Sequence, residues 1–239
     1  MSTRSTLLPI DLREAETVPA AVYDLVGPLH VVLLGTYAVP EQTPPAQARE
    51  AFGEEATEHL ETLAREFVAR GVEVESLVVF TPDPSETIER VATQHECHSI
   101  TFAGETDSFD RLLVPIRGGT NLIRLLGVTA WLADREDLSV TLLNVAGDDR
   151  REAQATLFLR GAKEWLVDEE GVDPARIDTR IERSGDPVGT IASVAAEFDA
   201  VVIGETKPSI RTLILGDFAR NVLDRVDCTV VVVRRDRPT

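Results

Sequence analysis

The side chains best suited to metal chemistry stand together at His95-Glu96-Cys97-His98. Imidazole and thiolate groups are common zinc ligands, so the cluster has the residue types of a metal site. Adjacent residues at a helix end point in different directions, however, and no second ligand group with matching spacing occurs elsewhere in the chain. We therefore interpret this segment as a helix end with Cys97 packed against the next strand, and we predict no metal site.

Hydrolytic chemistry has equally little support. The other two histidines, His30 and His59, fall on an expected strand and an expected helix face, and the chain has no G-x-S-x-G nucleophile elbow. Cys97 and Cys228 are too few for a disulfide framework, and Cys228 precedes an apolar run as a small buried side chain would. The sequence therefore predicts no catalytic residues and no enzyme activity.

The elements that must position any ligand alternate between strands and helices. In the second half, strand patterns at 112–116, 140–145, 176–183, 200–203 and 229–233 alternate with helical patterns at 121–133, 149–169, 188–197 and 217–225. The first half follows the same plan, with strands at 6–10, 30–34, 74–80 and 99–103 and helices at 14–25, 46–70 and 85–94. Such alternation with short connections predicts parallel sheets covered by helices.

An internal repeat relates these halves. DPSETIERVA, which begins at Asp83, and DPVGTIASVA, which begins at Asp186, are identical at six of ten positions. Gly104-Glu105-Thr106 recurs downstream as Gly204-Glu205-Thr206, in the same order. We predict two homologous domains, at 1–108 and 109–239. The first is truncated, because no counterpart of the last loop, helix and strand follows Thr106.

The charge of the chain excludes several roles. It carries 41 Asp plus Glu against 24 Lys plus Arg, a formal charge of −17, and two of its basic residues are lysines. This surface would repel nucleic acid and anionic membranes. Excess acid with scarce lysine is typical of proteins that work in concentrated salt, where charge repulsion is screened over about 3 Å. No signal peptide and no membrane-spanning run is visible, so we expect a soluble, cytoplasmic protein.

The order of elements and the strings LLVPIRGG, GETKPSIRTLILGDFARNVLDR and CTVVVVRR resemble the universal stress protein family, in tandem. The resemblance implies an α/β fold with two adenine-nucleotide-alpha-hydrolase-like, doubly wound parallel-sheet domains, and a role in stress survival. In ATP-binding members the first strand ends in Asp, and a G-x2-G-x9-G-[ST] loop follows the fourth strand. Its glycine amides approach phosphate oxygens at the switch point of the sheet.

The chain departs from that pattern at several positions. Gly204 and Gly216 match the first and last glycines, one residue closer together than in the family. Lys207 replaces the middle glycine, Asp217 the hydroxyl residue and Arg117 the aspartate. A carboxylate at position 217 would repel a phosphate and satisfy the helix amides itself. We predict that Arg117 and Asp217 form an ion pair that closes the old phosphate site.

A rival reading keeps a weak anion site. Arg117, Gly118, Gly119, Thr120 and Lys207 would line it, with the two cations replacing glycine amides as phosphate partners. ATP or AMP would be its ligand. Asp11 matches the acidic residue of the family in the first half, which has no phosphate loop, so the two parts of a nucleotide site are divided between the halves.

The missing last strand of the first domain suggests how the protein assembles. Family members pair through their last strands, and the first half lacks this strand. The run Thr229–Val233 is then left as an apolar edge, which is an aggregation risk unless it is paired or covered. We predict that it pairs with its copy in a second chain to form a homodimer.

The sequence thus predicts a universal stress protein-like binding and regulatory module, with a degenerate nucleotide site and no catalysis. Two alternatives remain open. One is an ATP- or AMP-binding universal stress protein with weak or no hydrolysis. The other is a partner-binding regulatory subunit of a membrane transporter, since related domains also occur fused to transporters.

Overall fold

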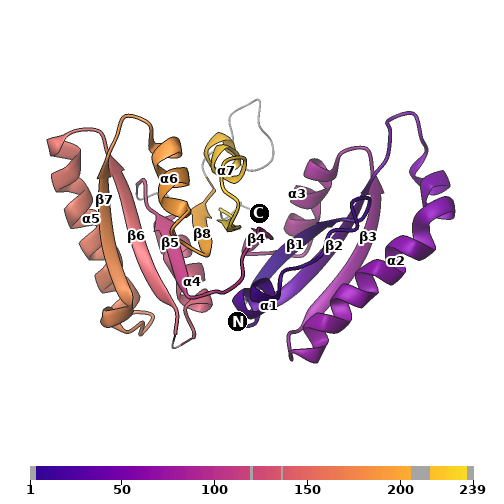
Figure 1. The fold of residues 1–239 in the computed structure, drawn as a ribbon, viewed down its shortest axis with the longest axis horizontal. Coiled ribbons are helices and arrows are strands. Elements are labelled where there is room, and N and C mark those ends of the chain that lie inside the picture. Colours follow the sequence, from indigo (N-terminus) through magenta and orange to yellow (C-terminus); the bar gives the residue numbers. More distant parts are fainter. Residues whose placement is uncertain (1–3, 119–120, 136, 206–215, 236–239) are drawn as a thin grey trace. The chain divides into compact units, whose positions relative to one another are not determined.

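The computed structural model describes residues 4–118, 121–135, 137–205 and 216–235. The chain forms two compact units, Met1–Phe102 and Ala103–Thr239. Each is an α/β unit in which helices cover both faces of a sheet (Figure 1). Residues 103–108 belong to the second unit by their contacts, whereas the repeat in the sequence predicts a boundary after residue 108.

The first unit holds four strands and three helices. In chain order these are β1 (Ser5–Asp11), α1 (Ala20–Val26), β2 (His30–Ala38), α2 (Pro45–Ala69), β3 (Val74–Thr81), α3 (Pro84–Gln94) and β4 (Ser99–Phe102). The strand order is β3-β2-β1-β4, and every pairing among them is parallel. The unit ends at β4, which confirms that the first half lacks the last helix and strand.

The second unit is the more complete one. Its elements are β5 (Arg111–Pro115), α4 (Leu122–Leu132), β6 (Ser139–Ala146), α5 (Asp149–Asp168), a 3-10 turn (Pro174–Arg176), β7 (Ile177–Arg183), α6 (Pro187–Ala195), β8 (Ala200–Gly204), α7 (Gly216–Leu223) and β9 (Thr229–Val233). The strand order is β9-β8-β5-β6-β7, and every pairing is parallel. From β5 the chain adds β6 and β7 on one side and then β8 and β9 on the other, so the switch point of the sheet lies between β5 and β8. The predicted fold class is confirmed.

The repeated sequence builds the same helix start in both units. Asp83 caps α3 by accepting the amide of Glu86 at 2.9 Å, and Asp186 caps α6 by accepting the amide of Gly189 at 3.1 Å. A proline occupies the first turn of each helix, where its missing N–H costs nothing. The second repeated string, Gly-Glu-Thr at 104–106 and at 204–206, also has the same role in both copies. The amides of Glu105 and Glu205 donate to the carbonyls of Asp227 and Val233, just before and at the end of β9.

One helix differs from the sequence prediction. The pattern predicted a helix over 14–25, but α1 begins at Ala20 after Pro19. Residues 11–16 form a turn instead, in which Ala15 has φ of 48° and the amide of Glu16 donates to the carbonyl of Asp11. This turn and the proline prevent an earlier helix start, so that part of the prediction is wrong.

Candidate functional site

A cavity of about 500 Å³ lies in the second unit where β5 and β6 end and α5 begins. Arg117 and Gly118 follow β5, and Asn144 lies near the end of β6. Side chains on α5 form the opposite wall. The described residues around the cavity are Arg117, Gly118, Asn144, Val145, Arg151, Gln154, Ala155, Phe158 and Pro187. Two guanidinium groups and an aromatic ring thus surround one space at the carboxyl ends of two strands.

Two hydrogen bonds between β5 and β6 fix the floor of this cavity. The amide of Ile116 donates to the carbonyl of Leu143 at 2.7 Å, and Asn144 Nδ2 donates to the carbonyl of Ile116 at 2.6 Å. The amide nitrogen of Asn144 is therefore engaged by the backbone, and its Oδ1 remains as an acceptor. A polar residue inside the apolar run Leu142–Val145 was the sequence signal that could have identified Asn144.

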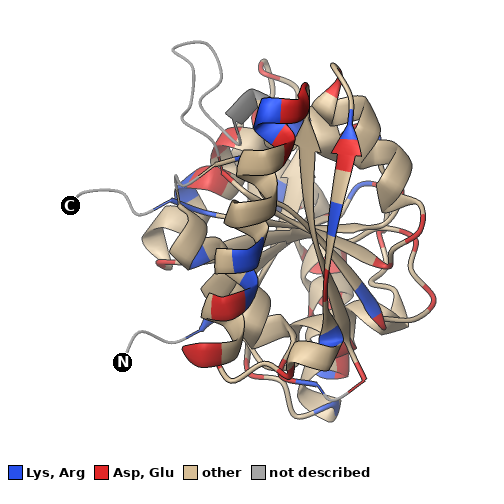
Figure 2. Ribbon diagram, turned by 90° about the vertical axis from the view of Figure 1, so that its left-hand side faces the viewer, with Lys and Arg blue, Asp and Glu red and all other residues tan. Residues whose placement is uncertain are grey.

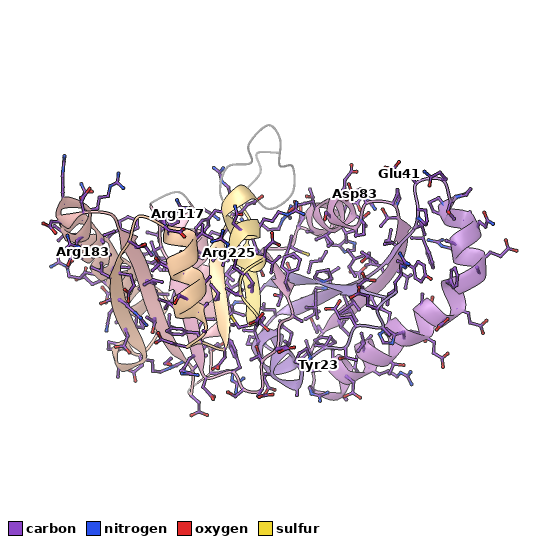
Figure 3. All side chains as sticks on the ribbon, turned by 45° about the horizontal axis from the view of Figure 1, so that its top comes forward. Tyr23, Glu41, Asp83, Arg117, Arg183 and Arg225 are labelled. Carbon is purple, nitrogen blue, oxygen red and sulfur yellow. The ribbon has the colours of Figure 1, made fainter. Side chains whose placement is uncertain are left out.

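Arg117 is held by an aromatic contact. Its guanidinium carbon lies 4.1 Å from the centroid of the Phe218 ring, in the first turn of α7. Partial burial lowers the pKa of Arg117, but the residue as a whole is exposed and carries its charge at neutral pH. Figure 3 shows Arg117 at the end of the second unit where the strands of its sheet finish. The sequence did not predict the Phe218 contact.

Arg151 is the second cation of the cavity. It stands in the first turn of α5, where its amide donates to the N-capping carboxylate of Asp148 at 2.9 Å. Its side-chain Nε lies 3.7 Å from the same carboxylate, and both side chains are largely exposed. An ion pair of this kind is weak in water, so the guanidinium stays available to an anionic ligand.

A buried charge cluster lies beside the ends of β8 and β9. Glu205 and Arg234 are each 6% exposed. Burial lowers the pKa of Arg124 on α4, the charge of Arg234 lowers it further, and Glu205 opposes both effects. Glu205 Oε2 also accepts the amide of Arg235 at 2.8 Å. A buried carboxylate among arginines thus supplies negative charge where these strands finish.

The predicted site residues are distributed as follows. Arg117 and Gly118 line the cavity, and Gly204 ends β8. Gly216 and Asp217 are the first two residues of α7, but the side chain of Asp217 is outside the described part of the chain, as are Gly119, Thr120 and Lys207. The predicted Arg117–Asp217 ion pair therefore stays a prediction.

The acidic residue of the first half, Asp11, is engaged locally. Its Oδ1 accepts the amide of Arg13 at 2.9 Å, and its amide donates to Glu16 Oε2 at 2.8 Å. Burial raises the pKa of Glu16, against the stabilising hydrogen bond from Asp11. The turn after β1 thus holds two carboxyl groups close together.

The histidine cluster divides among separate partners. His95 Nδ1 lies 3.2 Å from Glu75 Oε2, while His98 Nδ1 lies 3.2 Å from Ser5 Oγ. Cys97 is 1% exposed. His59 Nε2 contacts the carbonyl of Glu16 at 3.0 Å. In the ranges that the structure describes, no group of three His, Cys, Asp or Glu side chains is placed to hold a metal ion. Nor does any described helix have the length and apolar character that a membrane crossing requires.

Comparison with known proteins adds to this picture. The profile of the Universal stress protein family matches residues 108–234. No curated protein matches the chain in sequence. Among solved structures, a universal stress protein from Archaeoglobus fulgidus DSM 4304 is similar over 97% of this chain and 96% of its own, with a TM-score of 0.69 and 18% identity.

Two other similar structures are a domain of a transporter and a universal stress protein with a bound nucleotide. The cytoplasmic domain of a prokaryotic cation chloride cotransporter is similar over 98% of this chain and 96% of its own, with a TM-score of 0.56 and 13% identity. A universal stress protein from Archaeoglobus fulgidus in complex with dAMP covers 52% of this chain and 98% of its own, with a TM-score of 0.43 and 21% identity. At these identities the likeness concerns the fold.

Proposed function

Because the chain belongs to the universal stress protein family, we propose that it is a non-catalytic binding and regulatory module whose nucleotide site departs from the ATP-binding pattern. The contact between Arg117 and Phe218 carries this proposal. It directs a guanidinium toward the first turn of α7, where ATP-binding members present glycine amides and a hydroxyl group. The long triphosphate chain of ATP would have to displace this side chain.

A smaller anion has a site without that displacement. The 500 Å³ cavity offers Arg117 and Arg151 for an anionic group, Phe158 for a planar ring and the acceptor of Asn144 for a polar one. The buried Glu205 offsets part of the positive charge of Arg124 and Arg234, which makes these arginines weaker partners for a ligand phosphate. We therefore propose that a nucleoside monophosphate such as AMP binds here in preference to ATP. A related universal stress protein has been solved with dAMP.

The test is equilibrium binding of labelled AMP and ATP to the full chain, together with an assay for ATP hydrolysis. We expect saturable AMP binding, at least tenfold weaker ATP binding and no turnover. Arg151→Gln should weaken AMP binding about tenfold, corresponding to the loss of one charge-assisted hydrogen bond. Arg160→Gln is the matched control, because Arg160 lies on the same helix and outside the cavity wall, 3.7 Å from Glu164. Tighter binding of ATP than of AMP, with slow turnover, would support the alternative of an ATP-binding universal stress protein with weak hydrolysis and contradict this proposal.

The acidic surface suggests the cellular setting. We propose a cytoplasmic protein that works in concentrated salt, since a charge of −17 repels itself most strongly when salt is dilute. The midpoint of urea unfolding should rise between 0.1 M and 2 M KCl. A midpoint that falls or stays constant would contradict this proposal.

A further inference from the structure

The outer edge of the first unit's sheet is an apolar strand. β3 reads VESLVVFT and stands at the end of the order β3-β2-β1-β4. The amides of Val31 and Val39 donate to the carbonyls of Glu73 and Thr81, so the odd-numbered residues direct their backbone groups toward β2. By the alternation of a parallel ladder, the amides and carbonyls of Ser76, Val78 and Phe80 point outward. Within residues 4–102, no strand pairs with this edge.

The corresponding edge of the second unit is protected by charge. β7 reads IDTRIER, and Arg180 pairs with Glu182 at 2.7 Å and with Glu197 at 2.9 Å. Figure 2 views the molecule from this side and shows residues of both charges on the strand and the helices around it. Charged residues on an edge strand discourage the addition of another strand, and β3 carries one charged residue, Glu75, near its beginning.

A groove of about 790 Å³ follows the exposed edge between β3 and α2. Val78 and Phe80 line it from the strand, and Glu54, Glu58 and Glu61 line it from the helix. These glutamates are spaced by four and three residues, so they share one face of α2. Arg49 adds one positive charge to the lining. The groove is therefore apolar on the side of the strand and acidic on the side of the helix.

An aromatic cluster adjoins the Phe80 end of the groove. The Phe80 ring lies 5.0 Å from the Tyr37 ring, and Tyr37 stacks on Phe52 at 5.2 Å. Phe52 is 44% exposed, which is high for a side chain of its size. These rings give the groove a rigid, partly exposed apolar end at which a partner side chain can be buried.

The groove carboxylates favour a cationic occupant. None of Glu54, Glu58 and Glu61 forms an ion pair with another residue of the described chain. Glutamates at positions i and i+4 repel one another, and a positive partner relieves that repulsion. A second copy of this chain is a poor occupant, because it would bring an identical acidic wall against this one. A nucleic acid would be repelled for the same reason.

We propose that the β3 edge and the acidic groove beside it bind an extended, basic segment of a protein partner. The segment adds to the sheet as a further strand, with backbone hydrogen bonds to Ser76, Val78 and Phe80. Its alternate side chains face the groove, and Lys or Arg at those positions meets the three glutamates. This surface lies in the first unit and uses none of the residues of the second-unit cavity, so it is independent of the proposed nucleotide binding.

The experiment uses the full chain and a capped peptide of alternating lysine and valine, Ac-KVKVKVKV-amide. We expect saturable binding by isothermal titration calorimetry at 0.15 M salt, and protection of the amides of Val78 and Phe80 from hydrogen exchange. The double variant Glu58→Gln/Glu61→Gln should weaken binding at least tenfold. Glu50→Gln/Glu55→Gln is the matched control, because it removes the same charge from exposed positions of α2 outside the groove and should leave affinity within about twofold.

A second probe tests the strand addition without changing the protein. The same peptide with its valine amides N-methylated keeps its charge but loses half of its backbone donors, and it should bind at least tenfold more weakly. Equal loss in both double variants would reduce the effect to general electrostatic attraction and overturn the proposal. Undiminished binding of the methylated peptide, or no binding of the parent peptide, would overturn it as well.

Discussion

The guanidinium of Arg117 and the ring of Phe218 are in contact, with 4.1 Å between the guanidinium carbon and the ring centroid. The two residues are about a hundred positions apart, and their contact joins the end of β5 to the first turn of α7. A cation over an aromatic face is worth about 0.5–1 kcal/mol at a partly exposed site. We expect a double-mutant cycle of Arg117→Gln and Phe218→Leu, followed by urea unfolding, to give a coupling energy in that range.

The cycle separates the contact from packing. Phe218 is 8% exposed, so Phe218→Leu alone is expected to cost about 1–2 kcal/mol from lost burial whatever Arg117 does. Additive effects of the two substitutions would show that the contact contributes nothing to stability.

The two repeated helix caps make matched contributions. Asp83→Ala and Asp186→Ala should each lower the free energy of unfolding by about 0.5–2 kcal/mol, since each removes the acceptor for an amide in the first turn of a helix. The caps lie in different units and share no partner, so their effects should add. Denaturant unfolding of the two single variants and the double variant measures this. Glu86→Ala, next to the first cap, is a control that keeps the capping carboxylate.

These caps also show what the sequence could predict. The repeat DP…TI…VA predicts two equivalent helices, because it contains an aspartate that caps the helix start and a proline that fits the first turn. Arg117 and Gly118 follow β5 and line the cavity, and their role in binding a ligand stays a prediction. Asn144, Arg151 and Phe158 were missed, because they come from a strand and a helix that the resemblance does not mark, and only the packing of β6 against α5 brings them to the cavity. The late start of α1 was missed because local hydrogen bonds between Asp11 and Glu16 override the helical pattern.

Glu16 should respond to pH in a defined direction. Burial raises its pKa in the folded protein, so the ionised form is disfavoured by folding. The neutral form carries no such cost, which means that the associated stability is present at low pH and is lost as pH rises through the folded pKa. Glu16→Gln should therefore raise the urea midpoint at pH 7, and the gain should shrink as pH falls through the folded pKa and vanish once pH is below about 4.5. A gain that persists unchanged at pH 3.5 would contradict this explanation.

The thiol of Cys228 should react slowly. Burial raises its pKa from 9.0 to about 11, and the charges of Asp199 and Asp227 contribute in the same direction. The thiolate fraction at pH 8 then falls about 100-fold, and alkylation with it. In a Cys97→Ser background, iodoacetamide should modify the native protein slowly at pH 8 and the urea-unfolded protein rapidly. Stability linked to this thiol is present below pH 9.0 and is lost as pH rises toward about 11.

The homodimer expected through Thr229–Val233 stays a prediction. Within the second unit, the amide of Glu105 donates to the carbonyl of Asp227 just before this strand. Light scattering after size exclusion in molar salt should give about twice the chain mass of 26.1 kDa. A mass equal to one chain at micromolar concentration would contradict the dimer.

The close packing of Gly104 against the chain before β9 affects where the two units can be separated in an expressed fragment. A Cβ at this position would lie 2.3 Å from the carbonyl oxygen of Asp227, so no side chain fits while the segment contacts the chain before β9. The same segment holds β9 through the amides of Gly104 and Glu105, and Thr106 Oγ1 donates to the carbonyl of Asp199. A gene fragment for the second half that starts at residue 109 would omit all three donors. Residues 103–108, which precede the boundary predicted from the repeat, therefore fold with the second unit.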